Sequence, residues 1–141
     1  MPVRTADATW NGNLSDGDGM MKTESGAYEG DFSFASRFED TDGTNPEELI
    51  AAAHAGCFSM ALSNILADAG QTPERVHTTA KVHLEMVDDA PTITRIDLDT
   101  EGDVPELDEQ AFQEHAETAK ANCPVSKLVQ GAEISVSARL A

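Results

Sequence analysis

A long apolar segment in the middle of the chain constrains the fold more than any other feature. The stretch 49–67 is dominated by alanine and is interrupted only by His54 and short polar residues. Asn45 can cap a helix that begins at Pro46, and Gly70 can end it. Because the middle of this helix is apolar on nearly every side, the pattern predicts a buried helix wrapped by the rest of the protein, not a membrane span.

Length and composition favour a single globular domain over residues 1–141. Compact domains commonly have about 100 to 150 residues, and 40% hydrophobic with 25% charged residues is ordinary for a globular chain. The 26 acidic residues outnumber the 9 basic ones and give a formal net charge of -17. Such a field repels phosphate backbones and anionic membrane surfaces, so we expect neither a nucleic-acid nor a membrane partner.

The N-terminus lacks the apolar stretch of a signal peptide, which favours a cytoplasmic protein. The acidic surface fits a high-salt cytoplasm and an ordinary acidic soluble protein equally well. Two cysteines in a cytosolic protein are seldom a permanent disulfide, because that compartment keeps thiols reduced. We therefore expect them to be either inert core residues or reactive ones.

Alternating residues and turn signals predict strands in the first forty residues. The segments 5–10 and 20–23 can pair as a hairpin. The phenylalanines between positions 32 and 38 occur at even spacing, which predicts a half-buried strand. If that strand continues far enough, Arg37 points away from its phenylalanine face.

The second half of the chain predicts further strands and helices, and therefore a mixed α+β fold. The expected elements are an antiparallel pair of strands at 76–87 and 92–101, a helix at 109–121 capped by Asp108, a short helix at 124–130 and a strand at 133–140. Cys123-Pro124 separates the last two helices, because a residue before proline is disfavoured in the helical region.

Cys57 lies in the middle of the apolar helix, where a buried and inert thiol is the simplest interpretation. Apolar burial raises a thiol pKa, and a helix dipole acts only over the first turn. A reactive Cys57 therefore needs a nearby cation. His54, three residues earlier, is one candidate, although a core histidine bonded to a backbone or polar partner is the simpler interpretation. Arg37 is the better cation because its planar guanidinium stays charged.

Two glutamates stand at the positive end of the central helix, where carboxylates are favoured without any catalytic role. Glu48 can complete a capping box, which leaves Glu47 free to bind an arginine. A carboxylate alone would repel a thiolate, but one paired with Arg37 would orient the guanidinium toward the sulfur.

Cys123 precedes Pro124 at the start of the short helix, a position where thiolates are stabilised, although core packing is an open alternative. Both cysteines with His54 and His115 could supply four metal ligands, but no CxxC or HxxxH spacing is present. We therefore expect no metal.

Five segments of the sequence resemble the OsmC/Ohr family of organic hydroperoxide reductases, and its OsmC branch in particular. They are TESG at 23–26, RFE at 37–39, GTNPEELI at 43–50, AAHAGCFSMAL at 52–62 and CPVS at 123–126. Their order and spacing extend over essentially the whole chain, and the run around Cys57 is the most specific.

The resemblance implies a role for four residues. Cys57 corresponds to the peroxidatic nucleophile, Cys123 to the resolving cysteine, and Arg37 with Glu47 to the ion pair that holds the thiolate. It also implies an OsmC-like fold, in which a long central helix is wrapped by curved antiparallel sheets in an intertwined homodimer. Active sites would lie at the subunit interface.

The implied reaction is the reduction of an organic hydroperoxide to an alcohol, through a Cys57 sulfenic acid and then a Cys57–Cys123 disulfide. No cofactor is needed, and the family suggests an external lipoyl-type or small-thiol reductant. Candidates for an apolar substrate wall are Phe38, Leu49, Ile50 and Phe58. Two alternatives stay open: a non-catalytic stress-protective or ligand-binding module, and a Cys57 thioesterase with His54 as base.

Overall fold

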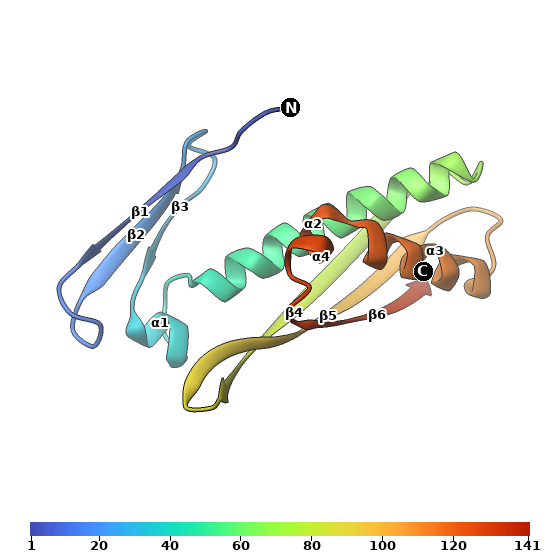
Figure 1. Ribbon diagram of the computed structural model, residues 1–141. Coiled ribbons are helices and arrows are strands. Elements are labelled where there is room, and N and C mark those ends of the chain that lie inside the picture. The colour runs from blue at the N-terminus through green and yellow to red at the C-terminus, as the bar shows by residue number, and fades with distance from the viewer. The chain divides into compact units, whose positions relative to one another are not determined.

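The computed structural model describes residues 1–141, which form two compact units, Met1–Leu49 and Ile50–Ala141 (Figure 1). The chain runs through three strands and a short helix, then a long helix, a hairpin, two helices and a last strand. The long helix spans the boundary between the units. That the whole chain acts as one domain stays a prediction.

The N-terminal unit contains a small antiparallel sheet with the strand order β1-β2-β3. Its strands are β1 (Ala6–Asn11), β2 (Asp18–Thr23) and β3 (Glu29–Phe32). Ala6 pairs with Thr23 and Asn11 with Asp18, which confirms the hairpin predicted from the turn residues.

A short helix follows β3 where the sequence predicts that the strand continues. Helix α1 spans Phe34–Phe38 and is capped by Ser33, whose hydroxyl accepts from the Ser36 backbone N–H at 3.1 Å. The Ser36 hydroxyl accepts in turn from the Ser33 N–H at 2.8 Å. This reciprocal capping satisfies two backbone donors, so it outweighs the period-two spacing of the phenylalanines. The strand prediction is wrong at this point.

Helix α2 spans Pro46–Asp68, close to the predicted bounds. Asn45 caps it, since its side-chain oxygen accepts from the Glu48 backbone N–H at 2.7 Å. Glu48 does not complete a capping box; its carboxylate accepts from the Thr44 hydroxyl at 2.8 Å. Gly70 follows the helix at φ +83°, a conformation that glycine adopts without strain.

The C-terminal unit is built on a sheet with the order β4-β5-β6. Strands β4 (Arg75–Val87) and β5 (Ala90–Asp103) form the predicted antiparallel hairpin around two aspartates with positive φ. Strand β6 (Glu133–Leu140) pairs with β5 in parallel, so this sheet is mixed and not wholly antiparallel. The parallel pairing follows from the helical crossover between β5 and β6.

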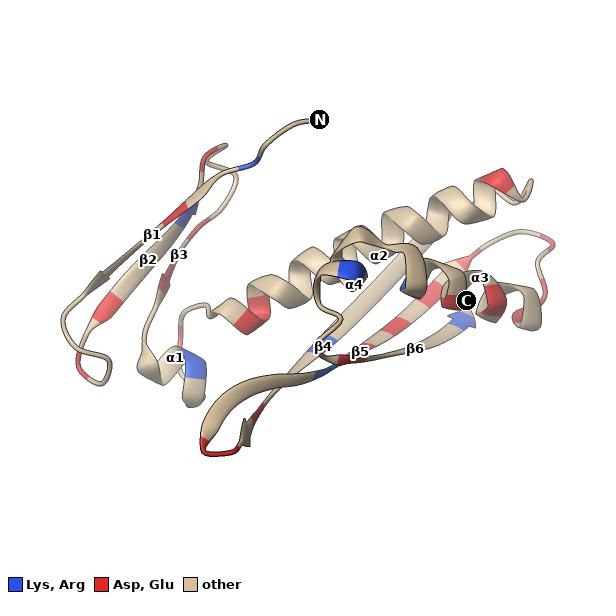
Figure 2. Cartoon of the chain, viewed as in Figure 1, with Lys and Arg blue, Asp and Glu red and all other residues tan.

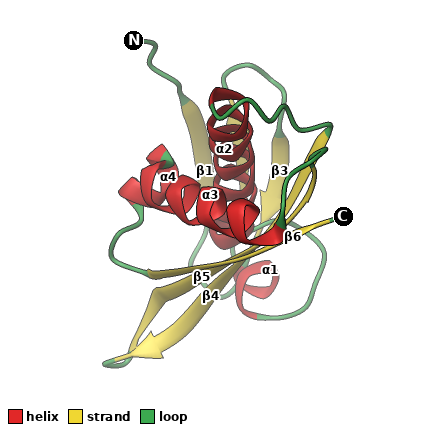
Figure 3. Ribbon diagram, turned by 90° about the vertical axis from the view of Figure 1, so that its right-hand side faces the viewer, coloured by secondary structure: helices red, strands yellow, loops and turns green.

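That crossover consists of α3 (Glu109–Asn122), capped by Asp108, and α4 (Pro124–Leu128). Figures 1 and 3 show α2 and α3 over the same face of the sheet. The core between them consists of Phe58, Leu62, Leu66, Ile96, Leu98, Val104, Phe112, Ala116, Ala119 and Cys123. Gly102 permits this packing, because a Cβ there would lie 2.6 Å from the Phe112 ring.

A single copy of the C-terminal unit covers only one face of α2. His54, Phe58, Leu62 and Leu66 recur every four residues and are fully buried. On the opposite face Ala52, Gly56 and Met60 are exposed, Met60 to 77%. The C-terminal unit of one copy therefore leaves one face of this apolar helix uncovered.

The open face of α2 is uncharged. Between Glu48 and Asp68 the helix carries no lysine, arginine or acidic residue (Figure 2). By length and composition α2 could cross a membrane, but one such helix is weak evidence, because the core helix of a soluble protein passes the same test. Its buried stripe packs into the core of this unit.

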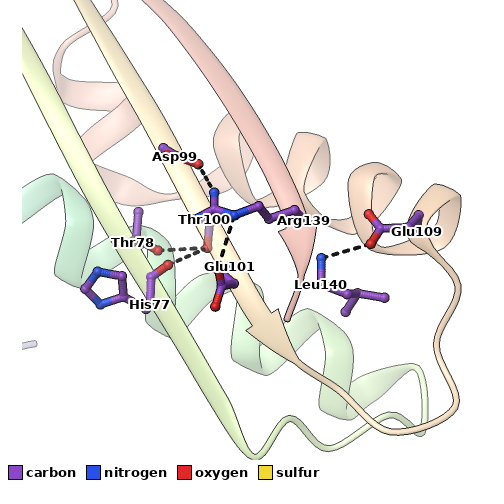
Figure 4. A network of polar contacts seen from close by, with 8 residues as sticks. All are labelled: His77, Thr78, Asp99, Thr100, Glu101, Glu109, Arg139 and Leu140. Carbon is purple, nitrogen blue, oxygen red and sulfur yellow. Dashed lines mark hydrogen bonds and ion pairs between the residues drawn. The ribbon is translucent and has the colours of Figure 1, made fainter.

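The two faces of the C-terminal sheet differ in chemistry (Figure 4). On the outer face Arg139 of β6 donates to Asp99 and to Glu101, the latter at 3.1 Å. On the inner face the hydroxyls of Thr78 and Thr100 lie 3.0 Å apart, and Thr100 donates to the His77 carbonyl. Thr100 is fully buried, so its hydroxyl needs these partners, because an unpaired polar group in the core is costly.

Candidate active site

Two cysteine thiols meet in the C-terminal unit. The Cys123 thiol donates to Cys57 Sγ, and the two sulfurs lie 2.9 Å apart, although 66 residues separate them in sequence. Both cysteines are reduced; Cys57 is half-buried and Cys123 is fully buried. The structure thus brings together the pair that the sequence predicts.

The helices on either side explain how the sulfurs meet. Cys57 projects from the middle of α2. Cys123 ends α3 and precedes Pro124, the first residue of α4. Its backbone N–H closes α3 by donating to Ala119 at 2.9 Å. Because Pro124 cannot continue α3, the chain turns at Cys123 and places its sulfur against α2.

Burial raises the pKa of the Cys57 thiol above its ordinary value. The hydrogen bond with Cys123 acts in the same direction, while a backbone hydrogen bond from Val125 favours the thiolate and acts in the opposite direction. The net direction is upward, so Cys57 is poorly ionised unless a cation approaches it.

His54 is fully buried and hydrogen-bonded to Ser126 of α4, with Nε2 and Oγ 2.8 Å apart. Burial lowers the pKa of His54, and its Nδ1 has no hydrogen-bond partner. His54 is therefore neutral near pH 7 and supplies no positive charge to Cys57. It is a core histidine with a polar partner, one of the two readings of the sequence.

The predicted ion pair is formed within the N-terminal unit. Arg37 Nη2 lies 2.6 Å from Glu47 Oε1, and Arg37 Nε donates to both Glu47 oxygens at 3.1 and 3.2 Å. Glu47 is buried and Arg37 is partly exposed. Because the Thr44 hydroxyl donates a hydrogen bond to Glu48, Glu47 is the glutamate available to the Arg37 guanidinium, as the sequence predicts.

The two pairs belong to different units: Arg37 and Glu47 to the first, Cys57 and Cys123 to the second. The ion pair and the dithiol are each formed as predicted. The contact between the guanidinium and the Cys57 sulfur stays a prediction, as do the catalytic roles of all four residues.

An apolar cavity of about 470 Å³ lies beside Arg37 in the N-terminal unit. It is lined by Trp10, Gly12, Leu14, Phe32, Ser33, Phe34, Arg37, Phe38 and Pro46. The sequence indicated Phe38 as a wall residue, but Trp10, Leu14 and the other two phenylalanines were missed. For Phe32 and Phe34 the signal was the even phenylalanine spacing, which we interpreted as a strand face.

The other three predicted wall residues do not line this cavity. Phe58 is fully buried in the core of the C-terminal unit, and Ile50 packs partly against that core. Leu49 lines a smaller cavity together with residues of β1 and β2. Phe58 packs in the core of this unit, and the assignment of these residues to a substrate wall stays a prediction.

The fold and the paired sulfurs define an α+β protein with two adjacent thiols, one on a central helix and one at the start of a short helix that begins at proline. A family model described as OsmC-like protein matches residues 39–138. This range includes both cysteines and Glu47.

Two relatives extend the match beyond that range. Over 138 residues, the chain is 46% identical to Peroxiredoxin OsmC of Escherichia coli (strain K12), covering 97% of this chain and 96% of the relative. The organic hydroperoxide resistance protein OhrB of Bacillus subtilis is 26% identical, with a TM-score of 0.69 over 97% of this chain and 98% of its own. The chain therefore belongs to the OsmC-like family.

A further solved structure supports the fold alone. A protein from Legionella pneumophila, described as an organic hydroperoxide resistance protein OsmC, gives a TM-score of 0.75 at 22% identity and covers 100% of this chain and 99% of its own. The predicted family and the predicted α+β fold class are confirmed.

Proposed function

We propose that this chain is a thiol-dependent peroxidase that reduces organic hydroperoxides to alcohols. The peroxidase class rests on family membership and on the near full-length similarity to a peroxiredoxin. The observation that carries the mechanism is the 2.9 Å separation of two reduced sulfurs, because a disulfide between them needs little movement.

In the first step the Cys57 thiolate attacks one oxygen of the hydroperoxide. The O–O bond breaks, the leaving oxygen takes a proton to become an alcohol, and Cys57 becomes a sulfenic acid. The thiolate and not the thiol is the nucleophile, so the upward pKa shift of Cys57 has to be offset in the working enzyme.

Arg37 supplies that offset in this proposal. Its guanidinium favours the thiolate and stabilises negative charge that grows on the peroxide oxygens in the transition state. Glu47 orients the guanidinium through the buried ion pair. In this proposal the active site lies at a subunit interface, and the guanidinium at each Cys57 comes from Arg37 of a second copy.

In the second step Cys123 attacks the sulfenic sulfur of Cys57, which releases water and forms the disulfide. An external dithiol of the lipoyl type, or a small thiol, then reduces this disulfide by exchange. The cycle needs no bound cofactor or metal. A cytoplasmic location fits this cycle, because the compartment keeps thiols reduced.

The apolar cavity beside Arg37 supports organic hydroperoxides as the substrate class. An alkyl or aryl group gains free energy by leaving water for a cavity lined by Trp10, Phe34 and Phe38, whereas hydrogen peroxide has no apolar part to bury. The charged end of the cavity wall, Arg37, is also the group assigned to the peroxide oxygens.

The open face of α2 supports a homodimer. This face is uncharged and includes Met60, and packing it against a second α2 would remove apolar surface from water. An antiparallel second helix would also bring the partner's ion pair toward Cys57, as the proposed catalysis requires. The inward-facing residues His54, Phe58 and Leu62 would be unaffected.

We expect Met60→Asp to convert dimer into monomer, because it places a charge in the proposed apolar interface. Sedimentation velocity at micromolar concentration measures the change, with Val3→Asp as a control at an exposed apolar position outside α2. A monomeric unsubstituted protein, or an unchanged dimer in Met60→Asp, would contradict the proposed interface.

A non-catalytic module with the same fold is the alternative, and thiol titration separates the two. After one equivalent of cumene hydroperoxide, the peroxidase loses both free thiols and gains one disulfide per chain. Cys123→Ser, as a matched control, should lose one thiol and stop at the sulfenic acid, detected with a dimedone-type reagent. Two unreacted thiols in the unsubstituted protein would establish the module instead.

The geometry does not favour a Cys57 thioesterase. His54 would have to accept a proton from Cys57, but its Nε2 is bonded to Ser126 and its Nδ1 has no partner. The thiol partner of Cys57 is another sulfur, Cys123. A hydrolase mechanism needs a nucleophile and base within hydrogen-bond reach.

A further inference from the structure

Polar contacts at two positions of α2 hold the segment 123–126. At Cys57 these are the Cys123 thiol and the Val125 backbone, and at His54 the contact is with Ser126 at 2.8 Å. On α2, His54 precedes Cys57 by three residues. On the other segment, Ser126 follows Cys123 by three. Both His54 and Ser126 are buried.

We propose that His54 and Ser126 are positioning residues for the resolving step. Their hydrogen bond keeps Cys123 beside Cys57 while Cys57 carries the extra oxygen and the disulfide has not yet formed. The inference rests on the proposed peroxidase function and adds two residues to it. The sequence left His54 as a core residue, a cation near Cys57 or a base, and gave Ser126 no role.

The segment needs such an anchor because the helix that contains it is short and has no side-chain cap. Helix α4 has only five residues, Cys123 makes no side-chain cap, and Leu128 at its end is 81% exposed. A single turn of helix is unstable by itself. The contact between the sulfurs cannot hold it during catalysis, because that contact is rebuilt when Cys57 is oxidised. The His54–Ser126 bond lies outside the reacting atoms and persists.

The position of Cys123 affects the competition between two reactions of the Cys57 sulfenic acid. In the resolving reaction the Cys123 thiol and the Cys57 sulfenic acid give a disulfide and water, with no change in the total number of oxidising equivalents. In the competing reaction a second hydroperoxide oxidises the sulfenic acid to a sulfinic acid and leaves as its alcohol. The first depends on how often Cys123 is in place, and the second depends on hydroperoxide concentration.

His54 is suited to this role because it has no other polar partner. Its Nδ1 is buried without a hydrogen bond, so Nε2 provides its only polar contact. Breaking that contact would leave an imidazole and a hydroxyl unpaired in the core, which opposes detachment of α4. The neutral ring, with its pKa lowered by burial, adds no charge that would draw water into the site.

The test compares Ser126→Ala with Ser59→Ala as a matched control. Ser59 is also a hydroxyl that ties α2 to a neighbour, since it donates to Thr78 of β4 at 2.8 Å, but it does not hold the 123–126 segment. Intact mass measures the ratio of disulfide to sulfinic acid over a series of cumene hydroperoxide concentrations. This ratio counts only molecules that have already reacted, so a partly unfolded fraction does not mimic the effect.

We expect Ser126→Ala to become over-oxidised at about a tenfold lower hydroperoxide concentration, because displacement of a reacting group by about 1 Å can cost up to about 100-fold in rate. Ser126→Thr, which keeps the hydroxyl, should restore the ratio, and Ser59→Ala should leave it unchanged. In His54→Leu the additional change Ser126→Ala should have no further effect, since the bond is already lost.

Two results would overturn the inference: an unchanged ratio in Ser126→Ala, or an equal fall in Ser59→Ala. Failure of the underlying function looks different. There the unsubstituted protein would not form a sulfenic acid or a disulfide at all, whatever residue occupies position 126.

Discussion

Replacing Cys57 with serine should reduce hydroperoxide turnover to the uncatalysed rate. A serine hydroxyl has the size of the thiol but is not ionised near neutral pH, and it cannot cycle through a sulfenic acid and a disulfide. The substitution also replaces the sulfur that accepts the Cys123 hydrogen bond with an oxygen. Consumption of cumene hydroperoxide with dihydrolipoamide as electron donor measures the loss.

The Cys123→Ser variant is the control for this experiment. It leaves Cys57 in place, so one equivalent of hydroperoxide should still be consumed quickly before turnover stops. Sustained turnover in Cys57→Ser would move the chemistry to another residue and reject the proposed nucleophile. Circular dichroism of both variants establishes that the core around α2 is intact.

Replacing Arg37 with alanine should lower the rate of the first oxidation by about 100-fold, the usual cost of losing one transition-state donor. It should also raise the pKa of Cys57 further, since burial already raises that pKa and the cation that offsets it would be gone. The alkylation rate of Cys57 would then begin to rise only at higher pH. A pH titration of alkylation with iodoacetamide measures the shift.

Arg95→Ala is the matched control, because Arg95 also pairs with a carboxylate, that of Asp97 at 2.7 Å, but is an exposed residue of β5 with no proposed role at Cys57. An identical pH profile in Arg37→Ala and the unsubstituted protein would remove Arg37 from the mechanism. A mixture tests which copy supplies the guanidinium. If it comes from the second copy, co-refolded Cys57→Ser and Arg37→Ala chains should regain activity in their mixed dimers.

The sequence by itself determined those elements whose signals are local. Asn45, Pro46 and Gly70 set the ends of α2, and Asp108 set the start of α3, because caps act on the backbone of their immediate neighbours. The proline after Cys123 separated α3 from α4 for the same reason. Four candidate site residues also followed from the sequence, through short runs that resemble a family.

The tertiary structure decided what depends on distant partners. Period-two spacing suggested a strand at the phenylalanines, and the Ser33–Ser36 capping box made it a helix. The parallel pairing of β6 with β5 depends on which end of the sheet the chain reaches after α3 and α4. The residue pattern of β6 itself does not indicate this. Because α2 is apolar on nearly every side, its sequence could not show that one copy fully buries only the face with His54, Phe58, Leu62 and Leu66.

The candidate site divides in the same way. Sequence could name Cys57 and Cys123, but their 2.9 Å contact closes a separation of 66 residues and depends on the packing of α3 and α4 against α2. The His54–Ser126 bond spans 72 residues and had no signal of its own. Helix caps and turns depend on neighbouring residues and can be predicted from sequence. Contacts between side chains that are distant in sequence exist only once the core that positions them has formed.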